Sequence, residues 1–214
     1  MSLPEIVSRE QWRAAREELR RREESARRER EALGAERRRL PMVEVDPEYL
    51  FEGGDGRATL LDLFEGRSQL VVHHFMFAPE WVTGCPCCAA FLDQVGHLAH
   101  LRARDTSFAA VSRAPFTRIL PFKARMGWTV PWYSSAPGGF NDDFEATVRD
   151  GGKPVERPGL SCFLRDRDRV FHTYSVYDAD LDELGTTAAL LDLTALGRRP
   201  AGSQALRLHD EYDF

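Results

Sequence analysis

The stretch Leu70-Val71-Val72-His73-His74-Phe75-Met76-Phe77 is an apolar run, and Gly84-Cys85-Pro86-Cys87-Cys88 follows it after a short interval. The run predicts a buried strand, and the cysteine motif opens a segment whose apolar residues recur with helical spacing. Backbone N–H groups and the helix dipole at a helix N-terminus stabilise a thiolate over a thiol. The sequence therefore predicts a strand, a turn and a helix that present a reactive cysteine.

Short apolar runs alternate with helical patterns along the chain after Pro41. We expect strands at 42–45, 70–77, 107–111, 132–134, 160–164 and 170–174. We expect helices over 60–64, after a glycine-rich turn at 53–56, from the cysteine motif to about Arg102, and over 116–126. This order predicts an α/β fold with a central mixed sheet, flanking helices and a terminal hairpin.

The first 40 residues differ from the rest in charge. The segment 8–40 carries 12 arginines and 8 acidic residues, and it has no proline before Pro41. Ser8 and Gln11 have the spacing of a capping box, so we expect one long helix. Its apolar positions recur every seven residues, at Trp12, Leu19, Ala26, Leu33 and Leu40. We expect a charged helical extension, 1–40, whose narrow stripe packs on its own domain, 41–214, or on a sister subunit in a homo-oligomer.

Composition narrows the class of protein. Hydrophobic residues make up 43% of the chain and aromatic residues 10%, which is typical of a protein with a buried core. The longest apolar run is shorter than the ~20 residues that span a bilayer, and the start has no signal-peptide pattern, so no membrane partner is expected. A net charge of −5 gives no overall case for nucleic acid. We expect a cytoplasmic protein, where a cysteine pair is more often catalytic or metal-binding than structural.

Thiol–disulfide exchange is the chemistry that the motif favours. Cys85 would be the exposed nucleophile, with Pro86 as the first helical residue, and Cys88, one turn later, would resolve the mixed disulfide. Cys87 lies roughly 100° from Cys88 around the helix and is either a packing residue or an auxiliary thiol. Cys162, in an apolar strand, is expected to be a core residue. The expected partner is a thiol or disulfide, on a protein or a small molecule, and no cofactor is required.

A peroxide reductase is the alternative among enzymes. Peroxiredoxins use Pro-x-x-x-Thr-x-x-Cys with a distant arginine. Pro79 and Thr83 have the right mutual spacing, but Cys85 comes one residue too soon. Arg113, after the next strand, would supply the cation, although a surface ion pair is the commoner role of such an arginine.

A module that binds copper or zinc without catalysis is the alternative from another class, because thiolates and imidazoles suit these ions. His73, His74 and His172 are the further candidates, and only one of the first two can reach a site at the strand end because they face opposite sides. His97 and His100 have helical i, i+3 spacing but no third ligand, so no metal ligand set is predicted. A protein without activity that works through its helical arm is the remaining alternative.

Several motifs together carry a resemblance to a known family. They are His74-Phe75-Met76-Phe77, Gly84-Cys85-Pro86-x-Cys88, Ser112-Arg113-Ala114-Pro115, Arg125-Met126-Gly127-Trp128, Pro158-Gly159-Leu160-Ser161, Phe171-His172-Thr173-Tyr174-Ser175 and His209-Asp210-Glu211-Tyr212. With these motifs, the chain resembles the bacterial thioredoxin-like proteins of domain-of-unknown-function family 899, over nearly its whole length. The resemblance implies a thioredoxin-like fold and no particular reaction. Thioredoxins place a cis-proline before the strand that faces the active site, and Ser161 is the residue nearest that position here.

Overall fold

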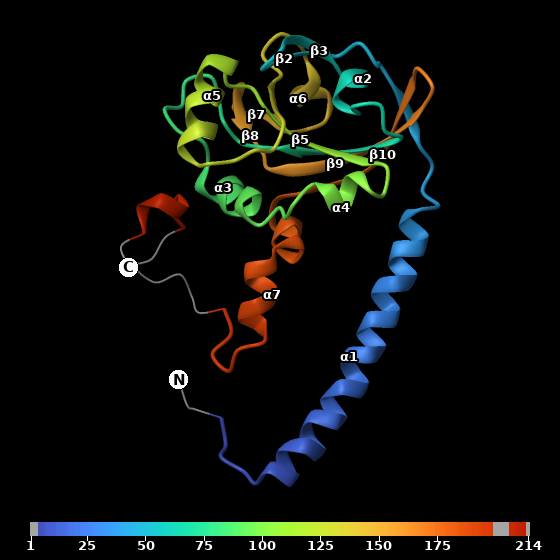
Figure 1. Ribbon diagram of the computed structural model, residues 1–214, viewed down its shortest axis with the longest axis vertical. Coiled ribbons are helices and arrows are strands. Elements are labelled where there is room, and N and C mark those ends of the chain that lie inside the picture. The colour runs from blue at the N-terminus through green and yellow to red at the C-terminus, as the bar shows by residue number, and fades with distance from the viewer. Residues whose placement is uncertain (1–3, 199–205, 213–214) are drawn as a thin grey trace. The chain divides into compact units, whose positions relative to one another are not determined.

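The computed structural model describes residues 4–198 and 206–212. Contacts divide the chain into two units, Met1–Pro41 and Met42–Phe214 (Figure 1). The first unit contains the helix α1 (Arg9–Arg37), and the second contains every strand and the other helices. None of the helices within the described ranges is both long enough and apolar enough to cross a membrane.

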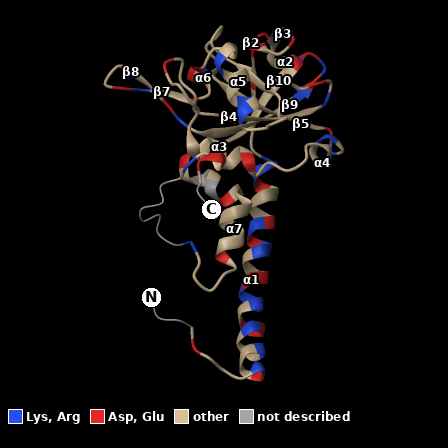
Figure 2. Cartoon of the chain, turned by 60° about the vertical axis from the view of Figure 1, so that its left-hand side comes forward, with Lys and Arg blue, Asp and Glu red and all other residues tan. Residues whose placement is uncertain are grey.

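Helix α1 is held by local interactions. The Ser8 hydroxyl accepts a hydrogen bond from the Gln11 N–H (3.2 Å), and the Gln11 side chain accepts one from the Ser8 N–H (3.0 Å), which is the predicted capping box. Basic and acidic residues alternate along the helix (Figure 2), with ion pairs such as Arg27 with Glu31 at 2.9 Å. The helix buries none of its residues. The packing of its apolar stripe stays a prediction.

The second unit is built on a mixed sheet of eight strands in the order β1-β10-β9-β4-β5-β6-β2-β3. Strand β4 lies in the centre, parallel to β5 and antiparallel to β9. A separate two-stranded sheet pairs β7 with β8. The strands are β1 (Val43–Val45), β2 (Leu50–Gly53), β3 (Gly56–Thr59), β4 (Gln69–His74), β5 (Thr106–Ser112), β6 (Trp132–Ser134), β7 (Thr147–Asp150), β8 (Lys153–Glu156), β9 (Gly159–Asp166) and β10 (Arg169–Tyr177).

Helices cover both faces of the sheet. Figure 1 shows α3 and α4 on one face and α2 and α6 on the other. The elements after α1 are α2 (Leu60–Leu63), α3 (Pro86–Asp93), α4 (Ala99–Arg102), α5 (Phe116–Arg125), α6 (Phe140–Asp143), the 3₁₀ segment η1 (Asp178–Leu184), α7 (Thr186–Asp192) and the 3₁₀ turn η2 (His209–Glu211). The predicted α/β fold, with a mixed central sheet, flanking helices and a long N-terminal helix, is confirmed.

The core consists of two clusters, one on each face of β4. Successive side chains of a strand point to opposite faces, so His73 lies on the face of α3 and His74 on the face of α6. The first cluster joins Phe75, Cys88 and Leu92 to α5 and β6, and the second joins Leu70 and Val72 to α2 and α6. The cysteine motif therefore belongs to one face only.

Several local predictions differ from the structure. The helix that begins at the motif ends at Asp93 instead of reaching Arg102, and α4 is a separate turn. Gly96 disfavours a continuous helix by about 1 kcal/mol relative to alanine, and the His97 ring accepts a hydrogen bond from the Ala99 N–H (3.2 Å) within the break. The predicted strand 70–77 ends at His74. The hairpins β2–β3, around the predicted glycine-rich turn, and β7–β8 lie where no strands were expected.

Candidate functional site

The chain between β4 and α3 places Cys85 at the start of the helix. The Cys85 N–H donates to the carbonyl of Met76 (3.0 Å), which folds the loop back on its own beginning. Gly84 is required by close packing, because a Cβ there would lie 2.5 Å from the Phe75 ring and 2.8 Å from the Phe122 ring. The Gly-Cys pair of the motif thus fits against the aromatic core.

The first turn of α3 separates the cysteines by burial. Cys85 is the N-cap residue in an extended conformation, and Pro86 occupies the first helical position as predicted. Cys85 is half-buried, Cys87 is exposed, and Cys88 is only 1% exposed. None of these residues is joined in a disulfide. One thiol of the Cys-x-x-Cys pair is thus accessible and the other is enclosed.

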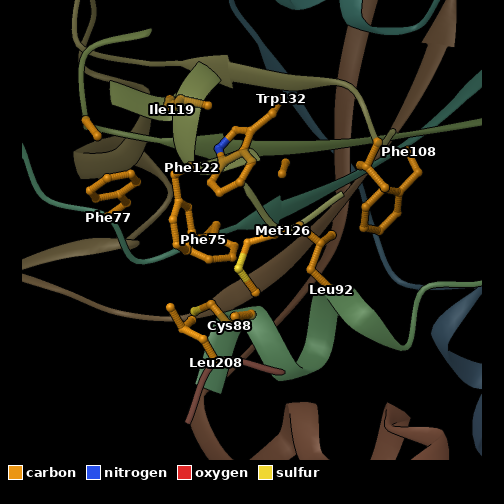
Figure 3. Close-up of a cluster of buried hydrophobic side chains, with 14 of the residues drawn as sticks. Phe75, Phe77, Cys88, Leu92, Phe108, Ile119, Phe122, Met126, Trp132 and Leu208 are labelled. Carbon is orange, nitrogen blue, oxygen red and sulfur yellow. The ribbon is translucent and has the colours of Figure 1, made fainter. Parts of the chain in front are cut away.

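Cys88 lies in the core cluster on the face of α3. Figure 3 shows it beside Leu208, with Met126 nearby in the same cluster. The Met76 N–H donates to the Cys88 sulfur at 3.3 Å. The pKa of Cys88 is well above that of an ordinary thiol, because its S–H donates a hydrogen bond to Cys85 and because burial disfavours the thiolate. Cys88 is therefore a protonated thiol at neutral pH.

Cys85 has the opposite electrostatic character. The hydrogen bond from the Cys88 thiol lowers the pKa of Cys85 to about 6, against the opposing effect of burial. The backbone N–H groups of Cys88 and Cys87, and then the Cys87 thiol, lower this pKa further. The two backbone donors are N–H groups of the kind that a helix N-terminus leaves unpaired. At neutral pH Cys85 is mainly a thiolate.

The two further residues of the peroxide hypothesis, Arg113 and Thr83, have different surroundings. The Arg113 guanidinium pairs with Glu156, with Nε 2.7 Å from the carboxylate, and the Glu156 side chain is only 3% exposed. The pKa of Glu156 is raised because burial outweighs the effect of Arg113. Thr83 is exposed and lines a surface hollow with Thr117 and Arg118. Arg113 is thus held in an ion pair, but with a buried carboxylate instead of the surface partner that its commoner role predicted.

The histidines of the metal hypothesis lie on both faces of the sheet. His172 on β10 bonds to the Ser175 hydroxyl, which bonds through Ser161 to His74, each step at 2.7 Å. This series of hydrogen-bonded side chains lies against Phe144, on the face of the sheet opposite the cysteines. Burial lowers the pKa of His74 to about 3 and lowers that of His172. Within residues 4–198 and 206–212, no group of three or more His, Cys, Asp or Glu side chains is placed to hold a metal ion.

The segment 206–212 covers part of the cysteine face, and sequence reasoning did not place it there. Leu208 is 2% exposed in the cluster of Cys88. The Arg125 guanidinium holds both carboxylate oxygens of Asp210, at 2.7 and 2.9 Å, and His209 lies 2.8 Å from Asp93 at the end of α3. The stretch His209-Asp210-Glu211-Tyr212 was noted only as a motif of the family resemblance, and no sequence signal named Arg125 or Asp93 as its partners.

The fold is similar to that of solved peroxiredoxins. A peroxiredoxin Q from Xanthomonas campestris is 15% identical, with a TM-score of 0.53 over 73% of this chain and 98% of its own. The X. campestris bacterioferritin comigratory protein, described for alkyl peroxide reduction, is 13% identical, with a TM-score of 0.52 over 68% of this chain and 94% of its own. Peroxidoxin BcpB from Mycobacterium tuberculosis is 18% identical, with a TM-score of 0.50 over 64% of this chain and 85% of its own. At these identities the likeness establishes the fold alone.

Sequence comparison gives the family. No curated protein matches the chain in sequence. The profile of a bacterial protein family of unknown function, DUF899, matches residues 1–212. The match includes the N-terminal helix, the cysteine motif and the C-terminal segment. The chain therefore belongs to the DUF899 family.

Proposed function

We propose that this protein is a thiol–disulfide oxidoreductase, with Cys85 as nucleophile and Cys88 as resolving cysteine. The observation that carries the proposal is the opposite character of the two thiols within one helical turn. Cys85 is accessible and has a pKa of about 6, whereas Cys88 is buried and has a raised pKa. Such a pair supplies a thiolate for attack and keeps the second thiol protonated until it is needed.

The reaction proceeds in two exchanges. The Cys85 thiolate attacks one sulfur of a substrate disulfide, a new Cys85–substrate disulfide forms, and the other substrate sulfur leaves as a thiolate that takes up a proton. Cys88 then loses its proton to solvent or to the departing thiolate and attacks the Cys85 sulfur. The second substrate thiol leaves, and a Cys85–Cys88 disulfide remains. The substrate gains two electrons, and an external dithiol must reduce the protein before the next cycle.

Formation of the disulfide between Cys85 and the substrate also changes the hydrogen bonding of Cys88. In the reduced protein the Cys88 S–H stabilises the Cys85 thiolate, so attack begins from an ionised and hydrogen-bonded nucleophile. Once Cys85 is joined to substrate, it carries no charge for that S–H to stabilise. The hydrogen bond that raised the pKa of Cys88 is then lost, and its deprotonation becomes easier.

Replacing Cys88 with serine should trap the protein on its substrate. Cys85 can still attack, but no thiol is present to release the mixed disulfide, so incubation with oxidised glutathione should leave one glutathione per chain. Intact-mass measurement and peptide mapping should find the adduct on Cys85. The Cys87→Ser variant is the matched control, since it removes the exposed thiol of the same turn, and it should release glutathione as the unmodified protein does. A stable adduct on Cys87, or no adduct in Cys88→Ser, would argue against the assigned roles.

Peroxide reduction is the second candidate, favoured by the low pKa of Cys85 and by the fold shared with peroxiredoxins. In that reaction the Cys85 thiolate attacks the peroxide oxygen and becomes a sulfenic acid, and an alcohol or water leaves. Cys88 then condenses with the sulfenic acid and expels water. Against it, Thr83 is exposed on a surface loop and Arg113 is engaged by a buried carboxylate. Disulfide exchange needs neither residue, and we therefore rank it first.

Metal analysis separates these reactions from the metal-binding alternative. The cysteine motif and the hydrogen-bonded series that links His74 to His172 lie on opposite faces of the sheet, which argues against one ligand set made of both. Protein purified without chelator should contain well under one equivalent of zinc or copper by elemental analysis. A stoichiometric ion that is lost in Cys85→Ser or His172→Ala would favour the metal module instead.

A further inference from the structure

A pocket of about 380 Å³ lies between α3 and the segment formed by η1 and α7. Its wall includes Cys87, Cys88 and Phe91 of α3, Leu181 of η1, and Ala188 of α7. Cys85 is not part of the wall, so the pocket adjoins the cysteine motif without being the accessible face of the nucleophile. The volume is near the lower end of the ~300–1,000 Å³ range of small-molecule sites, too small for a folded partner.

The charged and amide groups of the wall are satisfied by the chain itself. The Asp178 carboxylate accepts a hydrogen bond from Arg157 at 2.6 Å, and Arg198 pairs with Asp192 at 2.6 Å. Gln94 donates to a carbonyl of its own helix at 2.6 Å and accepts from the Thr187 N–H at 2.7 Å. A charged ligand would therefore meet no uncompensated opposite charge in this wall and would lose its hydration.

His73, another polar residue of the wall, differs from these charged and amide groups. It belongs to the wall of the pocket and is fully buried, and neither ring nitrogen has a hydrogen-bond partner among the described residues. Burial lowers the pKa of His73 to about 3, so the ring is neutral and offers one donor and one acceptor. A buried polar atom without a partner destabilises the protein, so a hydrogen bond to such an atom is favourable. The Phe91 ring of the same wall lies beside it, with the ring centroids 4.7 Å apart.

We propose that this pocket binds an uncharged, mainly apolar small molecule that carries one hydrogen-bonding group, with His73 as the partner of that group. The bound molecule lies beside Cys87 and Cys88 on the helix of the redox motif. The proposal stands on the pocket and its wall, and it does not depend on the reaction assigned to Cys85.

The first test uses 2-naphthol, two fused rings with one hydroxyl, and the reduced full-length protein. Calorimetric titration should give saturable binding at one site. Naphthalene-2-sulfonate, with the same rings and a negative charge, should bind about tenfold more weakly or not at all, since burying its charge is unfavourable. Absence of saturable binding by 2-naphthol, or equal binding of the sulfonate, would overturn the proposal.

Two neighbouring alanines of α7 provide a matched pair of variants. Ala188 lines the pocket, whereas Ala189 is exposed and does not. Ala188→Trp should fill the pocket and remove binding of 2-naphthol, and Ala189→Trp should bind it as the unmodified protein does. Equal affinity in the two variants would place the ligand elsewhere. His73→Phe keeps a ring of similar size without nitrogens, and it should weaken 2-naphthol about fivefold while leaving the binding of naphthalene unchanged. An unchanged affinity for 2-naphthol would remove His73 from the proposal.

A measurement on the unmodified protein does not depend on the folding of any variant. Saturating 2-naphthol should slow the alkylation of Cys87, read by mass mapping, because Cys87 is part of the wall. Thiol–disulfide exchange measured in parallel reports on Cys85 and can succeed or fail independently. An alkylation rate of Cys87 that does not respond to 2-naphthol would contradict the site even if exchange activity is present.

Discussion

Replacing Cys85 with serine should lower the rate of disulfide exchange by three orders of magnitude or more, on the order of what removal of a catalytic nucleophile costs. A hydroxyl does not replace a thiolate as the attacking group, and Cys88 cannot take over. Its side chain is 1% exposed and its pKa is raised well above that of an ordinary thiol. The measurement is the rate at which reduced protein releases thiols from oxidised glutathione.

The matched control for this prediction is Cys87→Ser, which makes the same atomic change two residues along the helix. Because Cys87 is only a minor donor to Cys85, after Cys88 and two backbone N–H groups, the control should retain most of the rate. If Cys85→Ser keeps an appreciable fraction of the activity while Cys87→Ser loses it, the nucleophile is Cys87 and our assignment fails.

Replacing Arg113 with alanine should destabilise the protein by about 3 kcal/mol, because the loss of one partner leaves a buried charge without compensation. Glu156 would remain with its side chain 3% exposed and would lose the cation that opposes the effect of burial on its pKa. Urea unfolding of Arg113→Ala and the unmodified protein at pH 7 measures the difference. The double variant Arg113→Ala with Glu156→Gln removes the buried charge as well, and it should recover most of the stability.

The loss of stability caused by Arg113→Ala depends on pH in a defined direction. The pKa of Glu156 in the folded protein is raised, and without Arg113 it should rise further. A carboxyl group with a raised folded pKa contributes stability below its unfolded pKa of about 4.3, and this contribution is lost as the pH rises through the folded pKa. The stability difference caused by Arg113→Ala should therefore be largest at pH 7 and shrink on acidification to about pH 4. Unchanged stability together with a loss of peroxide reduction would assign Arg113 to a substrate instead.

The parts of the fold that were predictable are those set by local pattern. The strand before the motif, the Pro86 start of α3 and the Ser8 cap of α1 each follow from residues within a few positions of one another. The hairpin β2–β3 escaped prediction because its strands are four residues long and the burial along β2 alternates too briefly to give a clear period. The break after α3 contains Gly96 and a hydrogen bond from the Ala99 N–H to the His97 ring, which apolar spacing alone does not reveal.

The parts of the site that were not predictable depend on residues distant in sequence. Arg113 and its partner Glu156 are 43 positions apart, and Arg125 and Asp210 are 85 positions apart. The pKa of Cys88 is raised first by its hydrogen bond to Cys85 within the motif, and then by burial. Leu208 belongs to the cluster that encloses Cys88, and no pattern near the motif records that contact. Likewise, the pocket beside Cys87 requires α7 to lie against α3, which only the tertiary structure provides. The motif indicated which thiols matter, and the fold determines how they differ.

The pH dependence of Cys85 also affects stability in a defined direction. Its folded pKa of about 6 is lower than the value of about 8.5 for an unperturbed thiol. Ionisation of Cys85 therefore stabilises the reduced protein fully above about pH 8.5, and this stabilisation is lost as the pH falls to about 6. The Cys88→Ala variant, which lacks the principal donor to the thiolate, should shift the titration of Cys85 upward.

The most direct test of the account is the rate of alkylation of Cys85 by iodoacetamide between pH 4 and pH 10, with each modified residue identified by mass mapping. The account predicts that Cys85 reacts first, with a midpoint near pH 6, that Cys88 is protected throughout the native range, and that the oxidised protein contains a Cys85–Cys88 disulfide. A Cys85 that titrates like an ordinary thiol, near pH 8.5, or an oxidised bond between Cys85 and Cys87, would contradict it.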